Sequence, residues 1–391
     1  MKHALRDLLV ACALSASMSM AAMAQEPIKI GFIGELTGAT AGVGQDQLDG
    51  FRLLLKRNEG KLGGVEIELI TEDSQFKPDV GTQVARRLVE REKVPIITGV
   101  SHSNIMMAVH KYITDKGVFL IGSNAGPSQV AGEQCSPYQF ITSWQGDQAA
   151  EAVGKYAKDQ GIKNIVALAP NYQAGKDVIQ GFKRYYDEPL ADEVYTSLTQ
   201  MDFSAELSQI AAANPDAVFA FFPGGLGVAF AKQYSQAGLM GKIPLLTTYV
   251  VDALTLPAIG DTALGVISGG FWAPDFPNQQ SKQFVEDFER EYGRIPSNYA
   301  AQSYDAAQLL DAAIAEVNGD VADKKAFMSA LKNAKFDSVR GEFKFGNNHF
   351  PIHAMHIMEV VKDGKGRLNL KTIATPFENY QDAYHERCPL S

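Results

Sequence analysis

The chain has 391 residues, of which 46% are hydrophobic and 21% are charged, and its formal net charge is −9. This composition is typical of a soluble globular protein, and the length suits about two or three domains. A negative chain with no block of basic residues excludes the positive stripe that nucleic-acid-binding proteins carry.

The first 24 residues have the pattern of a cleaved export signal. Lys2 and Arg6 give a charged start, residues 8–23 are apolar or small, and residues 22–24 (Ala-Met-Ala) fit the small-x-small cleavage rule. We therefore expect a periplasmic mature protein that begins at Gln25.

A lipoprotein signal is the alternative, because residues 9–12 (Leu-Val-Ala-Cys) resemble a lipoprotein cleavage box. Only four apolar residues separate Asp7 from Cys12, which is short for the apolar region of a signal. No later run of the sequence approaches the ~18 apolar residues of a membrane span.

Strands and helices alternate from residue 28 to residue 121. Apolar runs predict the strands, and apolar residues spaced three or four apart predict the helices between them. The predicted strands are 28–34, 65–71, 95–98 and 118–121, and the predicted helices are 45–58, 78–92 and a segment from Ile105 onward. This alternation predicts a parallel sheet.

The alternation begins again after an extended crossing segment at residues 138–143. The predicted helices are 147–160, 174–186, 204–213 and 226–238, and the predicted strands are 164–169, 193–197, 216–222, 244–247 and 266–271. The second half of the chain thus repeats the architecture of the first.

Three helical patterns and three strand patterns complete the chain, at 279–292, 299–317 and 323–334, and at 341–345, 353–361 and 368–373. No segment has the composition of a flexible linker. We predict an α/β protein of two Rossmann-like lobes joined by short hinge strands. The N-terminal lobe would hold residues 25–143 and 273–350, and the C-terminal lobe 144–272 and 351–391. A cleft between two lobes is a common site for small ligands.

Two short polar loops follow neighbouring strands of the first lobe. Residues 101–104 (Ser-His-Ser-Asn) open a helix, and residues 122–126 (Gly-Ser-Asn-Ala-Gly) follow the next strand. Open α/β sheets bind ligands at the carboxyl ends of their parallel strands. A helix start with free N–H groups suits a carboxylate, and Ser103 is the predicted N-cap. The alternative is that Ser103 and Asn124 are merely a helix cap and a turn residue.

Aromatic residues follow the strand ends of the second lobe. They are Tyr172, Phe221 and Phe222, Tyr249, and Phe271 and Trp272. Each residue alone is more typical of a buried core. Together they predict an aromatic wall of the cleft, in which tyrosine hydroxyls orient the ligand.

The sequence holds no constellation typical of catalysis or of metal binding. It lacks the G-x-S-x-G and Walker motifs, and residues 224–227 (Gly-Gly-Leu-Gly) lack the dinucleotide-binding spacing. Ser101, His102 and Ser103 are adjacent and cannot aim at one another as a triad. In the histidine cluster at 349, 353 and 356, the last two lie on opposite faces of a predicted strand. We therefore expect no enzyme, no cofactor and no metal.

Two cysteines, Cys135 and Cys388, remain once the predicted signal is removed. An even number of cysteines in an oxidising compartment favours a disulfide, here one that ties the C-terminal tail to the first lobe. Two separate thiols are the alternative.

An ordered series of short motifs gives the chain a resemblance to a known family. The motifs are IKIGFIGELTG (28–38), DSQFKP (73–78), GVSHSN (99–104), LIGSNAGP (120–127), FSAELSQI (203–210), NPDAVFAFF (214–222) and SYDAA (303–307). In this order they resemble the type 1 periplasmic substrate-binding proteins of ABC transporters, in the leucine/isoleucine/valine-binding branch. The resemblance covers nearly all of the mature chain.

The resemblance implies a Venus-flytrap pair of lobes with the ligand in the cleft, delivery to a membrane permease–ATPase complex, and no catalysis. In this family a serine at the position of Ser103 holds the ligand carboxylate, helped by the second loop, here residues 124–126. Amino-acid binders carry an acidic residue that pairs with the ligand ammonium, and Tyr249 falls at that position here, unless a shifted alignment places Asp252 there. A buried ammonium without a counter-charge is costly, so a carboxylate without an amine fits better.

We therefore predict an exported, monomeric solute-binding protein for an aromatic or apolar carboxylate. The predicted ligand-binding residues are His102, Ser103, Asn124, Ala125, Tyr172, Phe222, Tyr249 and Trp272. A branched-chain or other apolar amino acid, with Asp252 as its counter-ion, is the first alternative. A sensory module that presents its ligand-bound form to a receptor is the second.

Overall fold

The computed structural model describes residues 26–390. The predicted signal at residues 1–24 lies outside the described residues. Within residues 26–390 no helix combines the length and the hydropathy needed to cross a membrane.

The first lobe is built on a six-stranded sheet in the order β2-β3-β1-β4-β5-β6. Its strands are β1 (Ile28–Gly34), β2 (Lys61–Leu62), β3 (Val65–Asp73), β4 (Ile96–Gly99), β5 (Phe119–Gly122) and β6 (Gln139–Ile141). All neighbours pair in parallel except β2 and β3, which form a short hairpin. The carboxyl ends of β4 and β5 therefore lie at one edge, next to the two polar loops.

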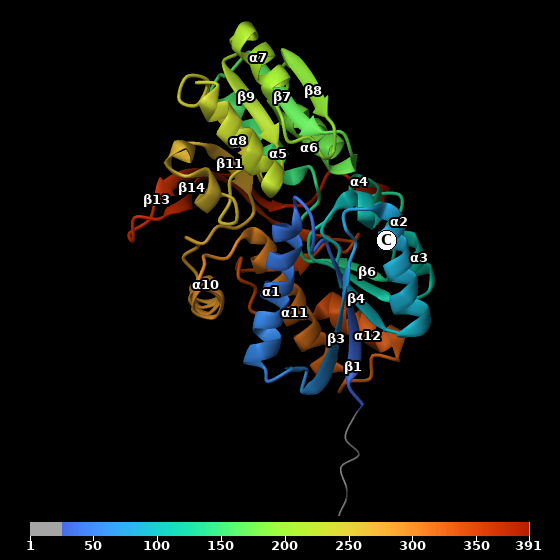
Figure 1. Ribbon diagram of the computed structural model, residues 1–391. Helices are drawn as coiled ribbons and strands as arrows, with labels where there is room; N and C mark the ends of the chain where they lie inside the picture. The colour runs from blue at the N-terminus through green and yellow to red at the C-terminus, as the bar shows by residue number, and fades with distance from the viewer. Residues whose placement is uncertain (1–25, 391) are drawn as a thin grey trace, which may run out of the picture.

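Helices cover both faces of this sheet (Figure 1). They are α1 (Ala41–Arg57), α2 (Pro78–Arg86), the π-helical turn at Arg87–Arg91, α3 (Ser103–Asp115), α4 (Ser128–Ala131), α10 (Gln279–Tyr292), α11 (Asn298–Glu316) and α12 (Lys324–Asn333). Successive residues of a strand point to opposite faces of the sheet, and β4 shows this. Ile96 packs in the core with α1 and α11, and Ile97 packs in the core with α2 and α3.

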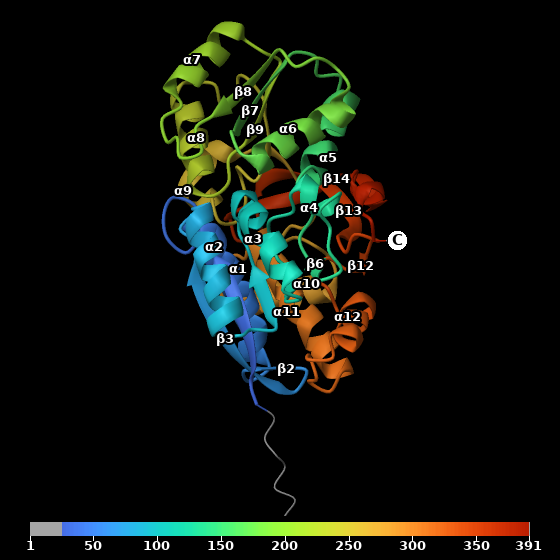
Figure 2. The ribbon, with the colours of Figure 1, turned by 90° about the vertical axis from the view of Figure 1, so that its right-hand side faces the viewer.

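The second lobe is built on an eight-stranded sheet whose main order is β12-β13-β11-β10-β9-β7-β8, with β14 paired to β13. Its strands are β7 (Ile165–Pro170), β8 (Asp192–Thr196), β9 (Ala217–Phe221), β10 (Leu245–Thr248), β11 (Ile267–Gly270), β12 (Lys344–Phe345), β13 (Pro351–Lys362) and β14 (Leu368–Tyr380). Its helices are α5 (Gln148–Asp159), α6 (Gln173–Tyr186), α7 (Ser204–Ala213), α8 (Gly225–Gln236) and α9 (Leu256–Ile259), with short 3-10 turns at Asp261–Ala263 and His385–Arg387. The two α/β lobes confirm the predicted fold class, and Figure 2 shows one lobe above the other.

The predicted lobe boundaries are wrong at two places. β12 pairs with β13 and so belongs to the second sheet, although residues 344–345 were placed in the first lobe. The end of the chain was placed in the second lobe, yet Tyr384 packs in the core cluster of α2 and α3. Cys388 is joined to Cys135 of the first lobe by a disulfide with a Cα–Cα distance of 5.6 Å. The boundaries are wrong because chain order alone does not indicate to which lobe a short strand or a C-terminal tail returns.

Candidate functional site

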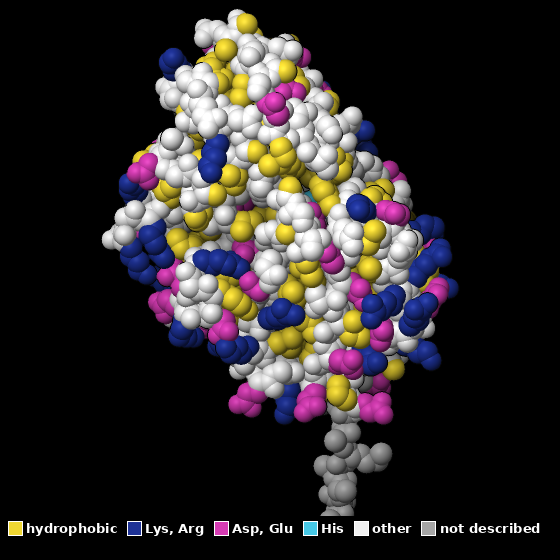
Figure 3. Space-filling model, in the orientation of Figure 1, with side chains coloured by type: hydrophobic (Ala, Val, Ile, Leu, Met, Phe, Trp, Pro, Cys, Tyr) yellow, Lys and Arg dark blue, Asp and Glu magenta, His cyan; other side chains and the backbone are white. Residues whose placement is uncertain are grey.

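A small cavity lies where the two lobes meet. Its walls come from the loops after β4 and β5, the crossing segment after β6, and the strand ends and α6 of the second lobe. About 40 Å³ of it is open to the centre of a water-sized group. On the face shown in Figure 3, hydrophobic side chains appear along the junction of the lobes. The site therefore suits a small ligand that both lobes enclose.

Two helix N-termini meet at the polar end of this cavity. α3 begins at Ser103 in the first lobe, and α6 begins at Gln173 in the second. Neither N-cap residue, His102 for α3 or Tyr172 for α6, caps its helix with its own side chain. The first backbone N–H groups of a helix lack intrahelical partners, and the helix dipole is positive there. This end of the cavity is thus suited to an anion.

Ser103 joins the two helices directly. Its hydroxyl oxygen accepts a hydrogen bond from the backbone N–H of Ala174 at 2.9 Å. The prediction that Ser103 is the N-cap of its helix is wrong, because His102 occupies the cap position and Ser103 is the first helical residue. This position favours a ligand-binding role for Ser103, because its hydroxyl faces the cavity and does not cap its own helix.

The second loop lines the cavity, although the side chain of Asn124 bonds within the protein. Its amide nitrogen donates to the backbone oxygen of Ser101, and its amide oxygen accepts from Gln302 at 2.6 Å. The backbone N–H of Ala125 donates to Val100 at 3.1 Å. Both residues therefore fix the first polar loop in place while forming part of the wall.

His102 is buried in the cavity wall beside a carboxylate. Its Nδ1 atom lies 3.0 Å from Oε2 of Glu35, and its ring lies 4.4 Å from that of Phe76, measured between centroids. The pair is close but not aligned as a hydrogen bond, and Nε2 of His102 has no protein partner among the described residues. His102 thus offers an unpaired ring nitrogen near the cavity.

Five aromatic side chains enclose the rest of the cavity: Trp144, Tyr172, Phe221, Tyr249 and Tyr299. Their rings contact one another, with centroids 4.8 Å apart for Trp144 and Tyr249 and 6.3 Å apart for Tyr172 and Phe221. Aromatic rings bury a large apolar area and prefer offset or edge contacts at such distances. The wall is therefore suited to a flat apolar group.

Two predicted wall residues lie elsewhere, and that part of the prediction is wrong. Phe222 packs against Phe203 and Phe230 inside the second lobe, with centroids 4.9 and 4.8 Å away. Trp272 donates its indole N–H to Ser281 on α10 at 2.9 Å. Successive residues of a strand point to opposite faces, so Phe221 reaches the cavity and its neighbour Phe222 does not.

The aromatic wall carries polar atoms that lack protein partners. Among the described residues, the indole nitrogen of Trp144 and the hydroxyls of Tyr249 and Tyr299 are buried without a hydrogen bond. Buried polar groups are normally paired, because an unpaired one costs about 1–3 kcal/mol. Three such atoms in one cavity point to an occupant with hydrogen-bonding groups.

The backbone is strained at two places beside this cavity. Val100, directly before the first polar loop, has φ of 61°, and Tyr249 has φ of 57°. A left-handed conformation is costly for a β-branched or bulky residue, and such strain concentrates at ligand sites.

Among the residues that the structure describes, Asp177 is the one acidic residue of the cavity lining. Its carboxylate accepts hydrogen bonds from the backbone and hydroxyl of Ser128, at 3.1 and 2.8 Å, and from Gln173 at 2.8 Å. Burial raises its pKa to about 6, and Asp147 adds to the shift. Asp177 therefore bonds the two lobes together with both oxygens.

Asp252 lies outside the lining, although it is buried close to it. Its Oδ1 atom accepts from the backbone of Leu254 and Thr255, each at 2.9 Å, and Oδ2 is unpaired. Burial raises its pKa to about 7. The position of Asp252 therefore does not make it a direct counter-ion in the cavity.

Sequence reasoning missed Trp144, Phe221 as distinct from Phe222, Asp177 and Tyr299. Trp144 lies directly after the crossing segment at residues 138–143, where the sequence has no periodicity, and Tyr299 lies in the first turn of α11, far along the chain. Asp177 lies three residues beyond the predicted helix start at residue 174, and its spacing of four residues from Gln173 is the available signal.

Two α/β lobes that close on a small cavity define a solute-binding protein. The family model described as periplasmic binding protein matches residues 27–365, so the chain belongs to that family. This confirms the predicted class, that of ABC-transporter solute-binding proteins. Leu/Ile/Val-binding protein homolog 6 of Brucella melitensis is 27% identical over 379 residues, which cover 94% of this chain and 95% of that protein.

Two solved structures are similar over nearly the whole chain. A solute-binding protein of an ABC transporter from R. palustris, in complex with benzoate, has a TM-score of 0.88 at 30% identity, covering 93% of this chain and 100% of that chain. One from Rhodopseudomonas palustris BisB5, in complex with 3,4-dihydroxybenzoic acid, has a TM-score of 0.87 at 29% identity, covering 92% and 99%.

Proposed function

We propose that this protein binds a small aromatic carboxylate in the inter-lobe cavity and delivers it, in the periplasm, to an ABC permease–ATPase complex. The observation that carries the proposal is the cavity itself, in which five aromatic rings enclose a space whose polar end is formed by two helix N-termini, with the Ser103 hydroxyl between them. The carboxylate would take the free N–H groups and the hydroxyl of Ser103, and the ring would lie among the aromatic side chains.

The solved relatives support this ligand class, since one is in complex with benzoate and another with 3,4-dihydroxybenzoic acid. The proposed role is binding and presentation without chemistry. Closure of the lobes would bury the ligand, and the closed form is the state that a permease can recognise.

An apolar amino acid is the second candidate, because curated relatives carry the name Leu/Ile/Val-binding protein homolog. Its ammonium group needs a negative partner in the cavity. Asp177 is the lining carboxylate, and it already accepts three hydrogen bonds from Ser128 and Gln173. Tyr249 lines the cavity and carries no charge that could replace one. The arrangement therefore favours an acid without an amine.

A thermal-shift screen of refolded, ligand-free protein separates the candidates. Benzoate is compared with leucine and with 4-methylpentanoate, which is leucine without its ammonium group. A ligand at 100 times its Kd stabilises the native state by about 2.7 kcal/mol. We expect benzoate to raise the Tm and leucine to leave it unchanged. A shift with leucine that 4-methylpentanoate does not reproduce would show that the site selects an ammonium group, and the proposal would be wrong.

A further inference from the structure

The C-terminal tail is fastened to the first lobe. The disulfide joins Cys388 to Cys135. Asn348, in the turn between β12 and β13, donates both to the backbone oxygen of Ala131 in the first lobe at 2.9 Å and to Asp382 of the tail at 2.8 Å. These bonds hold Tyr384, which is 4% exposed, in the core cluster beside α2 and α3.

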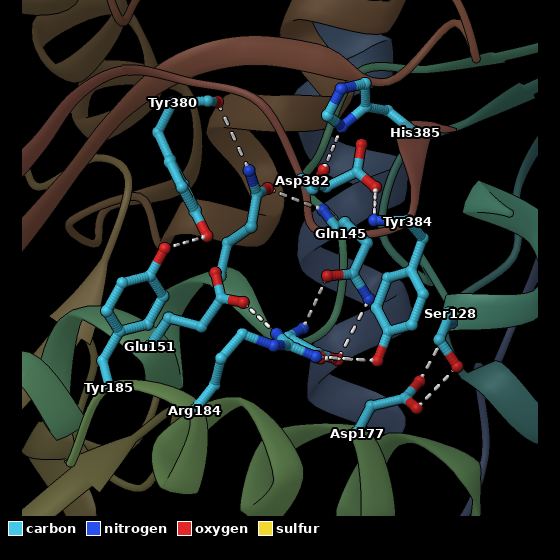
Figure 4. Close-up of polar contacts among 12 residues, drawn as sticks. Ser128, Gln145, Glu151, Asp177, Arg184, Tyr185, Tyr380, Asp382, Tyr384 and His385 are labelled. Carbon is cyan, nitrogen blue, oxygen red and sulfur yellow. Dashed lines mark hydrogen bonds and ion pairs between the residues drawn. The ribbon is translucent and has the colours of Figure 1, made fainter. Parts of the chain in front are cut away.

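The side chain of Tyr384 crosses from this tail to the second lobe (Figure 4). Its hydroxyl donates to Asp147, directly before α5, at 2.8 Å and accepts from Arg184 of α6 at 3.1 Å. The guanidinium of Arg184 also lies over the tyrosine ring, 5.4 Å from its centroid. One residue of the tail therefore contacts the N-cap of α5 and the last turn of α6 in the second lobe.

Arg184 is the cation of a buried acidic cluster. It lies 2.9 Å from Asp147 and also pairs with Glu151, and neither carboxylate is exposed. A buried charge that loses a hydrogen-bonding partner is costly. The tyrosine hydroxyl completes this cluster, so its contacts resist movement of the arginine.

α6 connects this cluster to the ligand cavity. The helix spans 14 residues, with Arg184 near its end and Asp177 and Ala174 near its start. Ala174 and Asp177 line the cavity and bond across to Ser103 and Ser128 of the first lobe. A helix of this length is a rigid rod of about 21 Å. Its position is thus fixed at one end by the cavity contacts and at the other by the tail.

We propose that Tyr384, on the disulfide-fastened tail, is a positioning residue for the ligand cavity, because it holds α6 through Arg184 in the closed arrangement of the lobes. The inference deepens the proposed function and rests on it for its effect on ligand affinity. The tail then contributes to binding although it does not touch the ligand.

The first test is Tyr384→Phe, which removes one hydroxyl and keeps the ring over Arg184. Tyr185→Phe is the matched control, because the hydroxyl of Tyr185 on the same helix bonds to Tyr380 at 3.1 Å within the second lobe. Hydrogen exchange is measured at the backbone amides of Ser128 and Ala174, both of which donate across the lobes. We expect exchange in ligand-free Tyr384→Phe to be faster by about fivefold, the loss expected for one hydrogen bond, and unchanged in Tyr185→Phe. Equal exchange in both variants and wild type would overturn the proposal.

The second test uses benzoate and the intrinsic tryptophan fluorescence, to which Trp144 in the cavity wall and Trp272 outside it both contribute. We expect Tyr384→Phe to raise the dissociation rate by about fivefold and to leave the association rate unchanged, since the contact belongs to the closed state. If wild-type protein does not bind benzoate, the proposed function fails, and the exchange measurement on ligand-free protein still decides the role of Tyr384. Binding with an unchanged dissociation rate in the variant would contradict that role.

The disulfide supplies an independent variant. Cys135→Ser with Cys388→Ser releases the tail, and we expect the same faster exchange at Ser128 and Ala174. Tyr384→Phe should then add little, because the two changes act through one contact. Additive effects would show that the disulfide and the tyrosine act separately, against the proposal.

Discussion

Ser103 and Ala174 are joined by a hydrogen bond of 2.9 Å, from the backbone N–H of one lobe to the side-chain oxygen of the other. The bond links the first residue of α3 to the second residue of α6, so two positive helix ends meet at one point of the cavity. The same hydroxyl can donate its proton to a ligand while it accepts from Ala174. Anion binding and lobe closure are therefore carried by one side chain.

Ser103→Ala should weaken carboxylate binding by about 1–3 kcal/mol, the cost of removing a hydrogen-bond partner of a charged group. The measurement is the Kd for benzoate by calorimetry. Ser208→Ala is the control, because Ser208 lies on α7 and its exposed hydroxyl bonds to Ser204 of the same helix. An unchanged Kd in Ser103→Ala would remove this residue from the site.

Tyr299→Phe should leave the free energy of unfolding of the ligand-free protein unchanged or raise it. Its hydroxyl is buried and unpaired, so removing it deletes a desolvated polar group. Tyr234→Phe is the matched control, because the hydroxyl of Tyr234 donates to the backbone of Ile243 at 3.0 Å. This control should lose about 1 kcal/mol in urea unfolding. A similar loss in Tyr299→Phe would mean that its hydroxyl has a partner in solution.

Gly126→Ala should destabilise the protein and weaken ligand binding. A methyl group there would collide with the backbone oxygen of Trp144, in the segment that brings this indole into the cavity wall. Gly364→Ala is the control, because a methyl group at that position meets nothing within 4 Å. We expect a lower Tm and a weaker response to benzoate for the first variant and neither for the second. Equal Tm values would contradict the close approach of the two segments.

Glu151 should make stability fall as pH rises. Burial, with Asp147 nearby, raises its pKa from 4.5 to about 7, while Arg184 opposes the shift. Between pH 4.5 and 7 the folded protein keeps a proton that the unfolded chain has released, so the free energy of unfolding decreases through this window, by at most about 1.4 kcal/mol per pH unit. Glu151→Gln should flatten the slope measured by urea unfolding at pH 5 to 8.

The control for that slope is Glu193→Gln. Lys183 and Tyr195 hydrogen-bond to this carboxylate and lower its pKa, so it titrates below the window. Its removal should leave the slope between pH 5 and 8 as in wild type. A slope in Glu151→Gln equal to that of wild type would show that Glu151 is ionised throughout the window, since Asp177 and Asp252 contribute equally to the slopes of both proteins.

The sequence was informative where periodicity and chain order carry the information. The alternation of strands and helices predicted both lobes, and the polar loops at residues 101–104 and 122–126 lie in the cavity wall. In a strand such as Ala217–Phe221, buried on both sides, every residue is apolar, so the pattern does not show which face Phe221 takes. The wrong prediction of Phe222 as the cavity residue, where the structure has Phe221, follows from that ambiguity.

Periodicity does not predict which segments far apart in the chain line one cavity. Trp144 and Tyr299 are 155 positions apart and share the cavity wall only because the segment before α5 and the start of α11 converge there. The proposed role of Tyr384 depends on the return of the tail to the first lobe, which the cysteine count suggested. It also depends on the hydrogen bonds of its hydroxyl with Arg184 and Asp147, which the sequence did not indicate.

A calorimetric titration of the refolded, ligand-free protein with benzoate and, separately, with leucine tests whether the cavity binds an aromatic carboxylate. We predict a saturable heat for benzoate with one site per chain and no binding heat for leucine. Binding of leucine with no binding of benzoate would contradict this prediction, because the cavity would then supply a counter-charge for an ammonium group that its present hydrogen bonds do not offer.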